Sequence, residues 1–239
     1  MKKSILFTLV FLLTAQFALS AQTVDEIVNK HFEAIGGKDK IGNIKTIKMT
    51  GNIELQAGMT APVNIQIVNN KSMRFDLSIQ GMTMNQVVDG ETGWQVMPFQ
   101  GNPNAEPIPA DQIKEMKGQM DVQGDLFNAK EKGNKVELVG NDEVDGTEVY
   151  KIKVTTKDGR VNYKYIDKAS SFIIKEVQIV KTEDKEVEGA TMFSNFKKTD
   201  DGITFPFNMN TEMAGGVIKW GKIEVNTPID PAIFKMPAK

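Results

Sequence analysis

The sequence predicts an α+β domain built on one large, curved antiparallel β-sheet. Many short segments alternate apolar and polar residues, which is the pattern of strands that bury one face. Asp-Gly pairs, which favour tight hairpin turns, separate several of these segments. Two other segments have helical spacing, and no change in composition marks a second domain, so about ten strands and two helices form one unit.

The N-terminus has the order of an export signal, with Lys2 and Lys3, then ILFTLVFLL, then small residues in ALSAQ. We therefore expect residues 1–21 to be a cleaved signal peptide and residues 22–239 to be a single periplasmic domain. The alternative is an N-terminal membrane anchor, but polar residues interrupt the apolar run before it is long enough to span a bilayer.

Composition excludes several classes of protein. The chain has no cysteine, so neither disulfides nor a lipid-modified N-terminal cysteine are expected. Removing Lys2 and Lys3 with the signal takes the net charge from −2 to −4, and a chain with that balance is a poor ligand for nucleic acid. No later apolar run reaches membrane length, so we expect a soluble mature protein, and a monomer.

The first helix is expected directly after Thr23, which forms a capping box with Glu26. Gly36 and Gly37 should end it, and a short turn then leads into the strands. The apolar residues of this helix share one side: Val24, Ile27, Val28, His31, Phe32 and Ile35.

The strands follow in two runs. In the first run, apolar residues occupy alternate positions from Ile47 to Leu55, from Val63 to Ile67 and from Met73 to Ile79, and Asp89-Gly90 then turns a hairpin. The second run begins at Lys135 and has further Asp-Gly turns. Its strand candidates are EVYKIKVT, VNYKYI, FIIKEVQIV, ATMFSNFK, ITFPFNMNTEM and VIKWGKIEV.

Between the two runs, the stretch GNPNAEPIP is expected to be a proline-rich loop. ADQIKEMKGQM then places Ile113, Met116 and Met120 on one helical stripe, although Gly118 weakens the helix. We expect a marginal second helix over residues 110–120.

The sequence offers no catalytic apparatus. It has one histidine, no nucleophile elbow, no phosphate loop and no zinc-binding HExxH helix. His31 lies on the apolar stripe of the first helix and is interpreted as a packing residue. The nearest match to a calcium loop, NDEVDGTEVYKI, has Ile152 where a glutamate is required. We therefore predict neither enzymatic activity nor a metal or other cofactor.

Twelve of the thirteen methionines remain once Met1 is removed, and many of them lie on the expected strand faces. Methionine suits surfaces that accept varied apolar partners, but it also fills ordinary cores. An apolar concave face needs a cover, which either the protein's own helices or a ligand can provide.

The order of these elements resembles the LolA-like periplasmic lipoprotein carriers and their sorting-protein relatives. The matching pieces span most of the mature chain: MRFDLSI, the D-G-x-x-x-W step at Asp89, Gly90 and Trp94, YKYIDKASSFIIKEV, FSNFKKTDDGITFP and EVNTPIDPAIFKMP. The resemblance implies a half-open, incomplete β-barrel covered by helices, which carries acyl chains without covalent chemistry. Because this chain lacks the cysteine of the lipidated receptor branch, it is more similar to the free carriers.

The resemblance also implies a site and partners. Lipoprotein or lipid acyl chains would be the ligand, and membrane-bound donor and acceptor proteins would be partners in outer-membrane lipoprotein sorting. The family's lid-latching arginine precedes a Pro-Asn pair that is missing here, so Lys71 and Arg74 are the candidate latch. The expected hollow and lid consist of Met49, Ile65, Phe75, Leu77, Met84, Phe205, Phe207 and Met209, under Ile113, Met116 and Met120.

The sequence is also compatible with two other functions. The domain could be an accessory or interaction module of an envelope protein complex, in which case its concave face would be filled. It could instead be a hydrolase that uses acidic residues, such as the cluster Glu183, Asp184, Glu186 and Glu188.

Overall fold

The computed structural model describes residues 22–55, 58–181, 186–211 and 215–237. The predicted signal peptide lies outside the described residues, as do Glu183 and Asp184 of the acidic cluster. None of the helices that the structure describes has the length and apolar character needed to cross a membrane.

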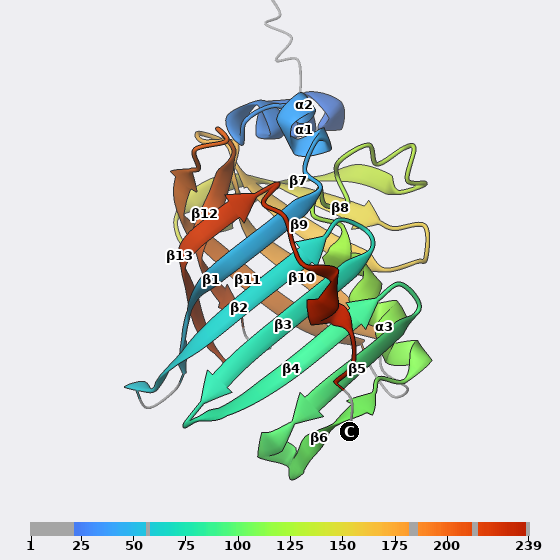
Figure 1. The fold of residues 1–239 in the computed structure, drawn as a ribbon. Helices are drawn as coiled ribbons and strands as arrows, with labels where there is room; N and C mark the ends of the chain where they lie inside the picture. The colour runs from blue at the N-terminus through green and yellow to red at the C-terminus, as the bar shows by residue number, and fades with distance from the viewer. Residues whose placement is uncertain (1–21, 56–57, 182–185, 212–214, 238–239) are drawn as a thin grey trace, which may run out of the picture.

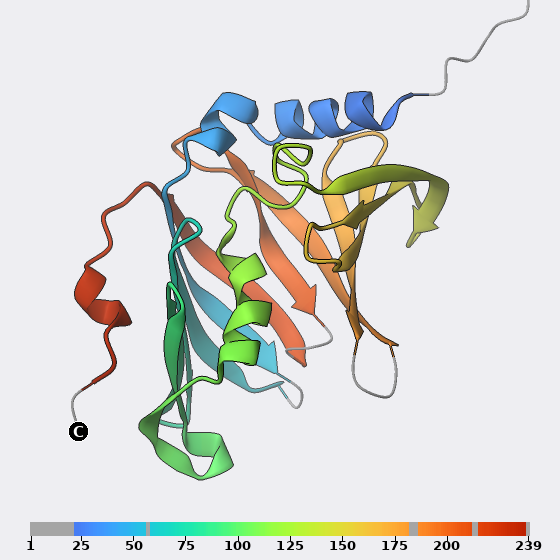
Figure 2. The same cartoon turned by 90° about the vertical axis from the view of Figure 1, so that its right-hand side faces the viewer.

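One antiparallel sheet forms most of the molecule and bends around a concave face (Figures 1 and 2). Over the described residues it has thirteen strands in the order β6-β5-β4-β3-β2-β1-β13-β12-β11-β10-β9-β8-β7, so β6 and β7 are its edges and the barrel is incomplete. The predicted fold class is confirmed. The strands are β1 (Thr46–Leu55), β2 (Thr60–Val68), β3 (Ser72–Ile79), β4 (Met82–Asp89), β5 (Thr92–Met97), β6 (Asn102–Pro107), β7 (Lys135–Val144), β8 (Thr147–Thr155), β9 (Val161–Asp167), β10 (Ile173–Lys181), β11 (Glu186–Lys198), β12 (Thr204–Thr211) and β13 (Gly216–Val225).

Two helices cap one end of the curved sheet (Figure 2). Helix α1 (Val24–Ala34) begins with the predicted capping box, and its residues Ile27 and Phe32 are buried. The segment after it was expected to be a turn but forms a short helix, α2 (Lys38–Gly42), because the buried side chain of Ile41 fastens it to the core. The apolar faces of the two helices therefore pack on one end of the sheet and close it.

A β-bulge brings the two halves of β13 onto the same face of the sheet. The pairing of β1 with β13 shifts between Thr50 and Gly51, so that Trp220 and Ile223 both lie in the concave core although an even alternation would separate them. Gly51 permits this close pairing, since a Cβ atom there would lie 2.3 Å from the carbonyl oxygen of Lys219.

The structure corrects one predicted element. The stretch expected to be a proline-rich loop contains strand β6, which pairs with β5 through Trp94 opposite Pro107. Proline cannot donate a ladder hydrogen bond, so it is tolerated at the edge of a sheet, where one side of the strand is unpaired. A short 3₁₀ turn, η2 (Pro98–Gln100), precedes the strand.

The predicted second helix is present but changes character along its length. Residues Ala110–Met116 form α3, and Lys117–Met120 continue as the 3₁₀ turn η3. Figure 2 shows this segment lying across the concave side of the sheet.

The C-terminal segment covers part of the opposite, convex face. Its 3₁₀ turn η5 (Pro231–Phe234) contacts β3 and β4, and the indole Nε1 of Trp94 donates a 2.9 Å hydrogen bond to the carbonyl of Phe234. Trp94, Phe234 and Val87 form a small buried cluster there. The two tryptophans thus lie on opposite faces of the sheet, Trp94 on the convex side and Trp220 in the concave core.

Candidate functional site

The concave face carries an apolar surface that is only partly covered. Strand register places Met49, Ile65 and Phe75 side by side across β1, β2 and β3, and pairs Leu77 with Met84 across β3 and β4. All five side chains are half-buried, although they pack on, or lie beside, a fully buried core. Apolar area therefore remains accessible on this face.

Strand β12 extends the same surface around the bend of the sheet. Met209 lies opposite Ile218, which in turn lies opposite Ile53 of the concave core. Since side chains alternate along a strand, Phe205 and Phe207 share the face of Met209. All three are half-buried and pack against the concave core. The eight residues predicted to line the hollow thus lie on one face.

Segment α3–η3 covers the part of this face formed by β2 to β4. Ile113 and Met120 are buried, and Met116 is half-buried beside them. Their neighbours in this cluster include Ile67, Met73 and Val88 of the sheet. Ile113 and Met120 are therefore used in packing, and of the three residues predicted to form the lid only Met116 keeps exposed surface.

Contacts at its C-terminal end hold the segment in place. The amide of Asn70 donates to the carbonyl of Met120 at 2.9 Å, and the amide of Val122 donates to Oδ1 of Asn69. From the other side, the guanidinium of Arg160 lies so close to Gly118 that a Cβ atom there would collide with it. Gly118 thus admits Arg160 as well as weakening the helix.

The structure places both predicted latch residues away from α3. Arg74 lies on the convex face, where Nη1 donates to the carbonyl of Ile233 at 2.8 Å and Nε pairs with Asp76 at 2.9 Å. Its neighbour Phe75 is concave, and alternation along β3 turns Arg74 away from α3. Lys71 is exposed in the turn between β2 and β3. The contacts at the end of α3–η3 are made instead by the side chain of Asn69, the backbone amide of Asn70 and the guanidinium of Arg160.

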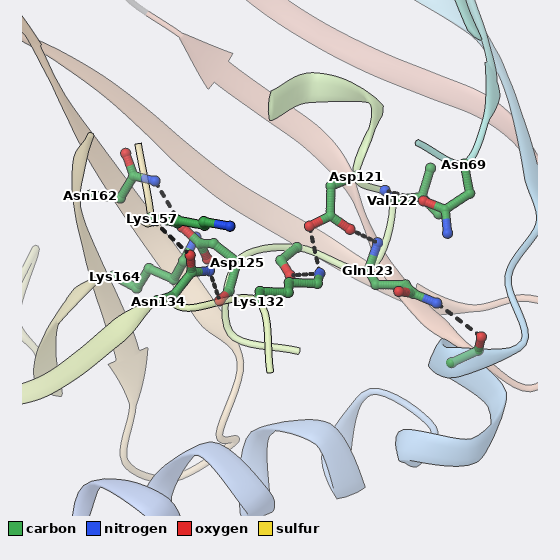
Figure 3. A network of polar contacts seen from close by, with 12 residues as sticks. Asn69, Asp121, Val122, Gln123, Asp125, Lys132, Asn134, Lys157, Asn162 and Lys164 are labelled. Carbon is green, nitrogen blue, oxygen red and sulfur yellow. Dashed lines mark hydrogen bonds and ion pairs between the residues drawn. The ribbon is translucent and has the colours of Figure 1, made fainter. Parts of the chain in front are cut away.

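A buried charged cluster lies at the concave face of β9 and β10 (Figure 3). The Nζ atom of Lys164 lies 3.0 Å from Asp125 Oδ1 and 3.0 Å from Glu176 Oε2, and only 8% of the lysine side chain is exposed. Asn162 donates to the second oxygen of Asp125 at 2.7 Å. Burial alone would lower the pKa of Lys164, but the charges of Glu176 and Asp125 outweigh it and raise that pKa above its ordinary value.

This cluster anchors the loop that follows η3. Asp125 belongs to that loop, as does Gln123, whose Nε2 donates to the carbonyl of Gly42 in α2 at 2.9 Å (Figure 3). Lys132 pairs with Asp121 at 2.5 Å and closes the loop on itself. The loop therefore joins the cap helices to the sheet.

A cavity of about 190 Å³ lies where cap helices, loop and sheet meet, and we call it the cap-end cavity. It is lined by α1 and α2, by the loop after η3, and by β10 to β12; the lining residues include His31, Ile41, Val122, Glu176, Phe193 and Phe205. Phe205 belongs both to the lining of this cavity and to the concave surface, so the two meet at this residue. An engineered cavity of about 150 Å³ accepts benzene, so the cap-end cavity suits the end of a ligand rather than a whole lipid.

A second and larger hollow, of about 440 Å³, lies between α1 and α2. It is lined by polar side chains such as Asn29, Glu33, Lys38 and Asp39. It is therefore a poor site for an apolar ligand, despite its size.

His31 is the one histidine of the chain, and its side chain is buried beside Phe32, with ring centres 5.4 Å apart. Its packing role agrees with the prediction. Burial lowers the pKa of His31 to about 4, so the imidazole is neutral near pH 7. Among the residues that the structure describes, no group of three or more acidic or histidine side chains is placed to hold a metal ion.

Comparison with known proteins finds relatives by structure and not by sequence. No protein-family model and no curated protein matches the sequence. A LolA superfamily protein from Nitrosomonas europaea is similar in structure, with a TM-score of 0.54 and 14% identity over 90% of this chain and 98% of that one. A lipoprotein-sorting protein domain from Vibrio parahaemolyticus scores 0.52 at 12% identity, over 87% and 94% of the two chains. A DUF1329 family protein from Desulfovibrio piger scores 0.51 at 15% identity, over 90% and 98%.

Proposed function

We propose that this chain, whose fold is LolA-like, is a carrier that holds an acyl chain of a lipoprotein or another lipid against its concave face. The fold is shared with a LolA superfamily protein and with a domain named for sorting lipoproteins of the outer membrane. Together with the export signal in the sequence, this supports a role in the periplasm, in outer-membrane lipoprotein sorting.

The half-buried state of the eight concave residues is the observation that carries the proposal. Contact between water and an apolar face is unfavourable. A ligand that covers the face displaces this water, and each methylene group that becomes buried contributes about 0.8 kcal/mol to binding. A chain that buries six methylenes would gain roughly 5 kcal/mol, which suits reversible carriage. The competing interaction-module function would need this face to be filled, whereas all eight residues keep part of their surface exposed.

Lipid that copurifies with the protein tests the proposal. Protein produced with its own export signal should yield roughly one equivalent of an acyl-bearing molecule when it is extracted with organic solvent and the extract is analysed by mass spectrometry. Protein denatured and washed before refolding serves as the blank and should take up an added fatty acid. Protein that yields no lipid and takes up none would favour the interaction module.

A further inference from the structure

His31, which lines the cap-end cavity, has one ring nitrogen without a hydrogen-bond partner among the described residues. The Nδ1 atom of His31 lies 2.9 Å from the carbonyl oxygen of Ser171. A carbonyl only accepts hydrogen bonds, so Nδ1 carries the proton and Nε2 of the neutral ring is left as an acceptor. Among the described residues no donor reaches Nε2, although His31 is only 7% exposed.

The cap-end cavity is the empty space beside the His31 side chain. Among the described residues, Asp125 Oδ1 is the only fully buried side-chain oxygen or nitrogen without a hydrogen bond, and it is ion-paired with Lys164. The Nε2 atom is therefore not sealed in the core. A ligand that donates to this acceptor replaces its limited contact with water by a direct hydrogen bond.

The charges beside the cavity restrict which ligand group can approach. Glu176 lines the cavity. It and Asp125 both pair with the ammonium of Lys164, so two negative carboxylates face one positive charge and the cluster is net negative. A carboxylate or phosphate would be repelled. A ligand cation would have to leave water for a mostly apolar cavity, while Lys164 already neutralises Glu176 at 3.0 Å.

We propose that the cap-end cavity is a subsite for a neutral hydrogen-bond donor, namely the hydroxyl of a hydroxylated acyl chain, which donates to Nε2 of His31. This inference rests on the proposed function, because the rest of the acyl chain would lie along the concave face of the protein, which meets the cavity at Phe205. The preferred lipids would then be those whose acyl chain has a hydroxyl near the end that enters the cap-end cavity.

The histidine signals of the unaltered protein give the first test. Because the chain has one histidine, untagged protein shows a single imidazole in nuclear magnetic resonance spectra. We expect 16-hydroxyhexadecanoic acid to move the Nε2 nitrogen signal in the direction of an accepted hydrogen bond. Hexadecanoic acid, which ends in a methyl group, should leave that signal nearly unchanged. Equal shifts with both acids would overturn the subsite.

Affinities of a variant give the second test. His31→Asn keeps a side-chain N–H for the Ser171 carbonyl and removes the Nε2 acceptor, so 16-hydroxyhexadecanoic acid should bind about tenfold more weakly, with hexadecanoic acid little changed. Lys30→Asn, one residue earlier and exposed on α1, is the matched control and should alter neither affinity.

The outcomes separate the two proposals. If hexadecanoic acid binds but both acids lose affinity equally in His31→Asn, the subsite is wrong while the carrier function stands. If neither acid binds the unaltered protein, the carrier function itself is wrong. Hexadecanedioic acid, with a carboxylate at each end, should bind more weakly than either acid, and tighter binding of this probe would also refute the subsite.

Discussion

Replacing Lys164 with methionine should lower the free energy of unfolding by about 3–5 kcal/mol, because breaking a buried ion pair leaves charge uncompensated in the interior. The lysine lies 3.0 Å from carboxylate oxygens of both Asp125 and Glu176. Methionine has a similar length and no charge, so the loss would come from the two stranded carboxylates. Urea denaturation followed by circular dichroism measures the change.

Two controls separate buried charge from simple loss of a lysine. Lys219→Met removes a lysine whose 2.7 Å pair with Glu54 is about half exposed, and such a pair contributes at most about 1 kcal/mol. The triple change Lys164→Met, Asp125→Asn and Glu176→Gln removes all three charges and should recover much of the stability. A loss in Lys164→Met no larger than in Lys219→Met would show that the cluster does not hold the loop.

Replacing Leu77 with glutamate should weaken acyl-chain binding by about a hundredfold, which is roughly 2.7 kcal/mol. Leu77 lies on the concave face beside Met84 and Val63. A carboxylate at this position must either lose water when the chain binds or keep water in the hollow, and both oppose binding. Displacement of a fluorescent fatty acid measures the effect.

Ser78→Glu is the matched control, since it places the same charge one residue further along β3. Alternation turns that residue to the other face, where the hydroxyl of Ser78 lies 2.9 Å from that of Thr83. The affinity of the Ser78→Glu variant for the fatty acid should remain within about twofold of that of the unaltered protein. Leu77 is a better position than Phe207, because Nζ of Lys197 lies 4.9 Å from the Phe207 ring centre and would neutralise a new carboxylate. Equal affinity in the two glutamate variants would contradict the concave-face site.

Periodicity was enough to predict most of the fold. The capping box at Thr23 and the Asp-Gly turns appear where local residue preferences placed them, because turns and helix ends depend on a few neighbouring residues. Strand alternation likewise predicted that Phe75 and Leu77 would share a face. Strand β6 was missed because prolines argue against a central strand, and nothing local indicates that a segment will lie at the edge of a sheet.

The remaining features depend on contacts between distant segments. Trp220 and Ile223 fall on opposite sides of an evenly alternating strand, and the bulge that unites them arises from pairing with Gly51 in β1. The cluster around Lys164 joins a loop to two strands, so no single segment reveals it. One local signal existed. Lys164 is two residues from the buried Ile166 and therefore shares its face of the strand, and a lysine on a buried face is expected to have a charged partner.

Tryptophan quenching by a brominated fatty acid tests the central claim most directly, because the two tryptophans report on opposite faces of the sheet. Trp220 lies in the concave core, with its Nε1 3.2 Å from the sulfur of Met209, whereas Trp94 lies beneath the C-terminal segment on the convex face. In Trp94→Phe, bound brominated fatty acid should quench the fluorescence of Trp220. In Trp220→Phe, it should leave the fluorescence of Trp94 unchanged. Quenching of Trp94 with Trp220 unaffected, or quenching of neither, would contradict an acyl chain held on the concave face.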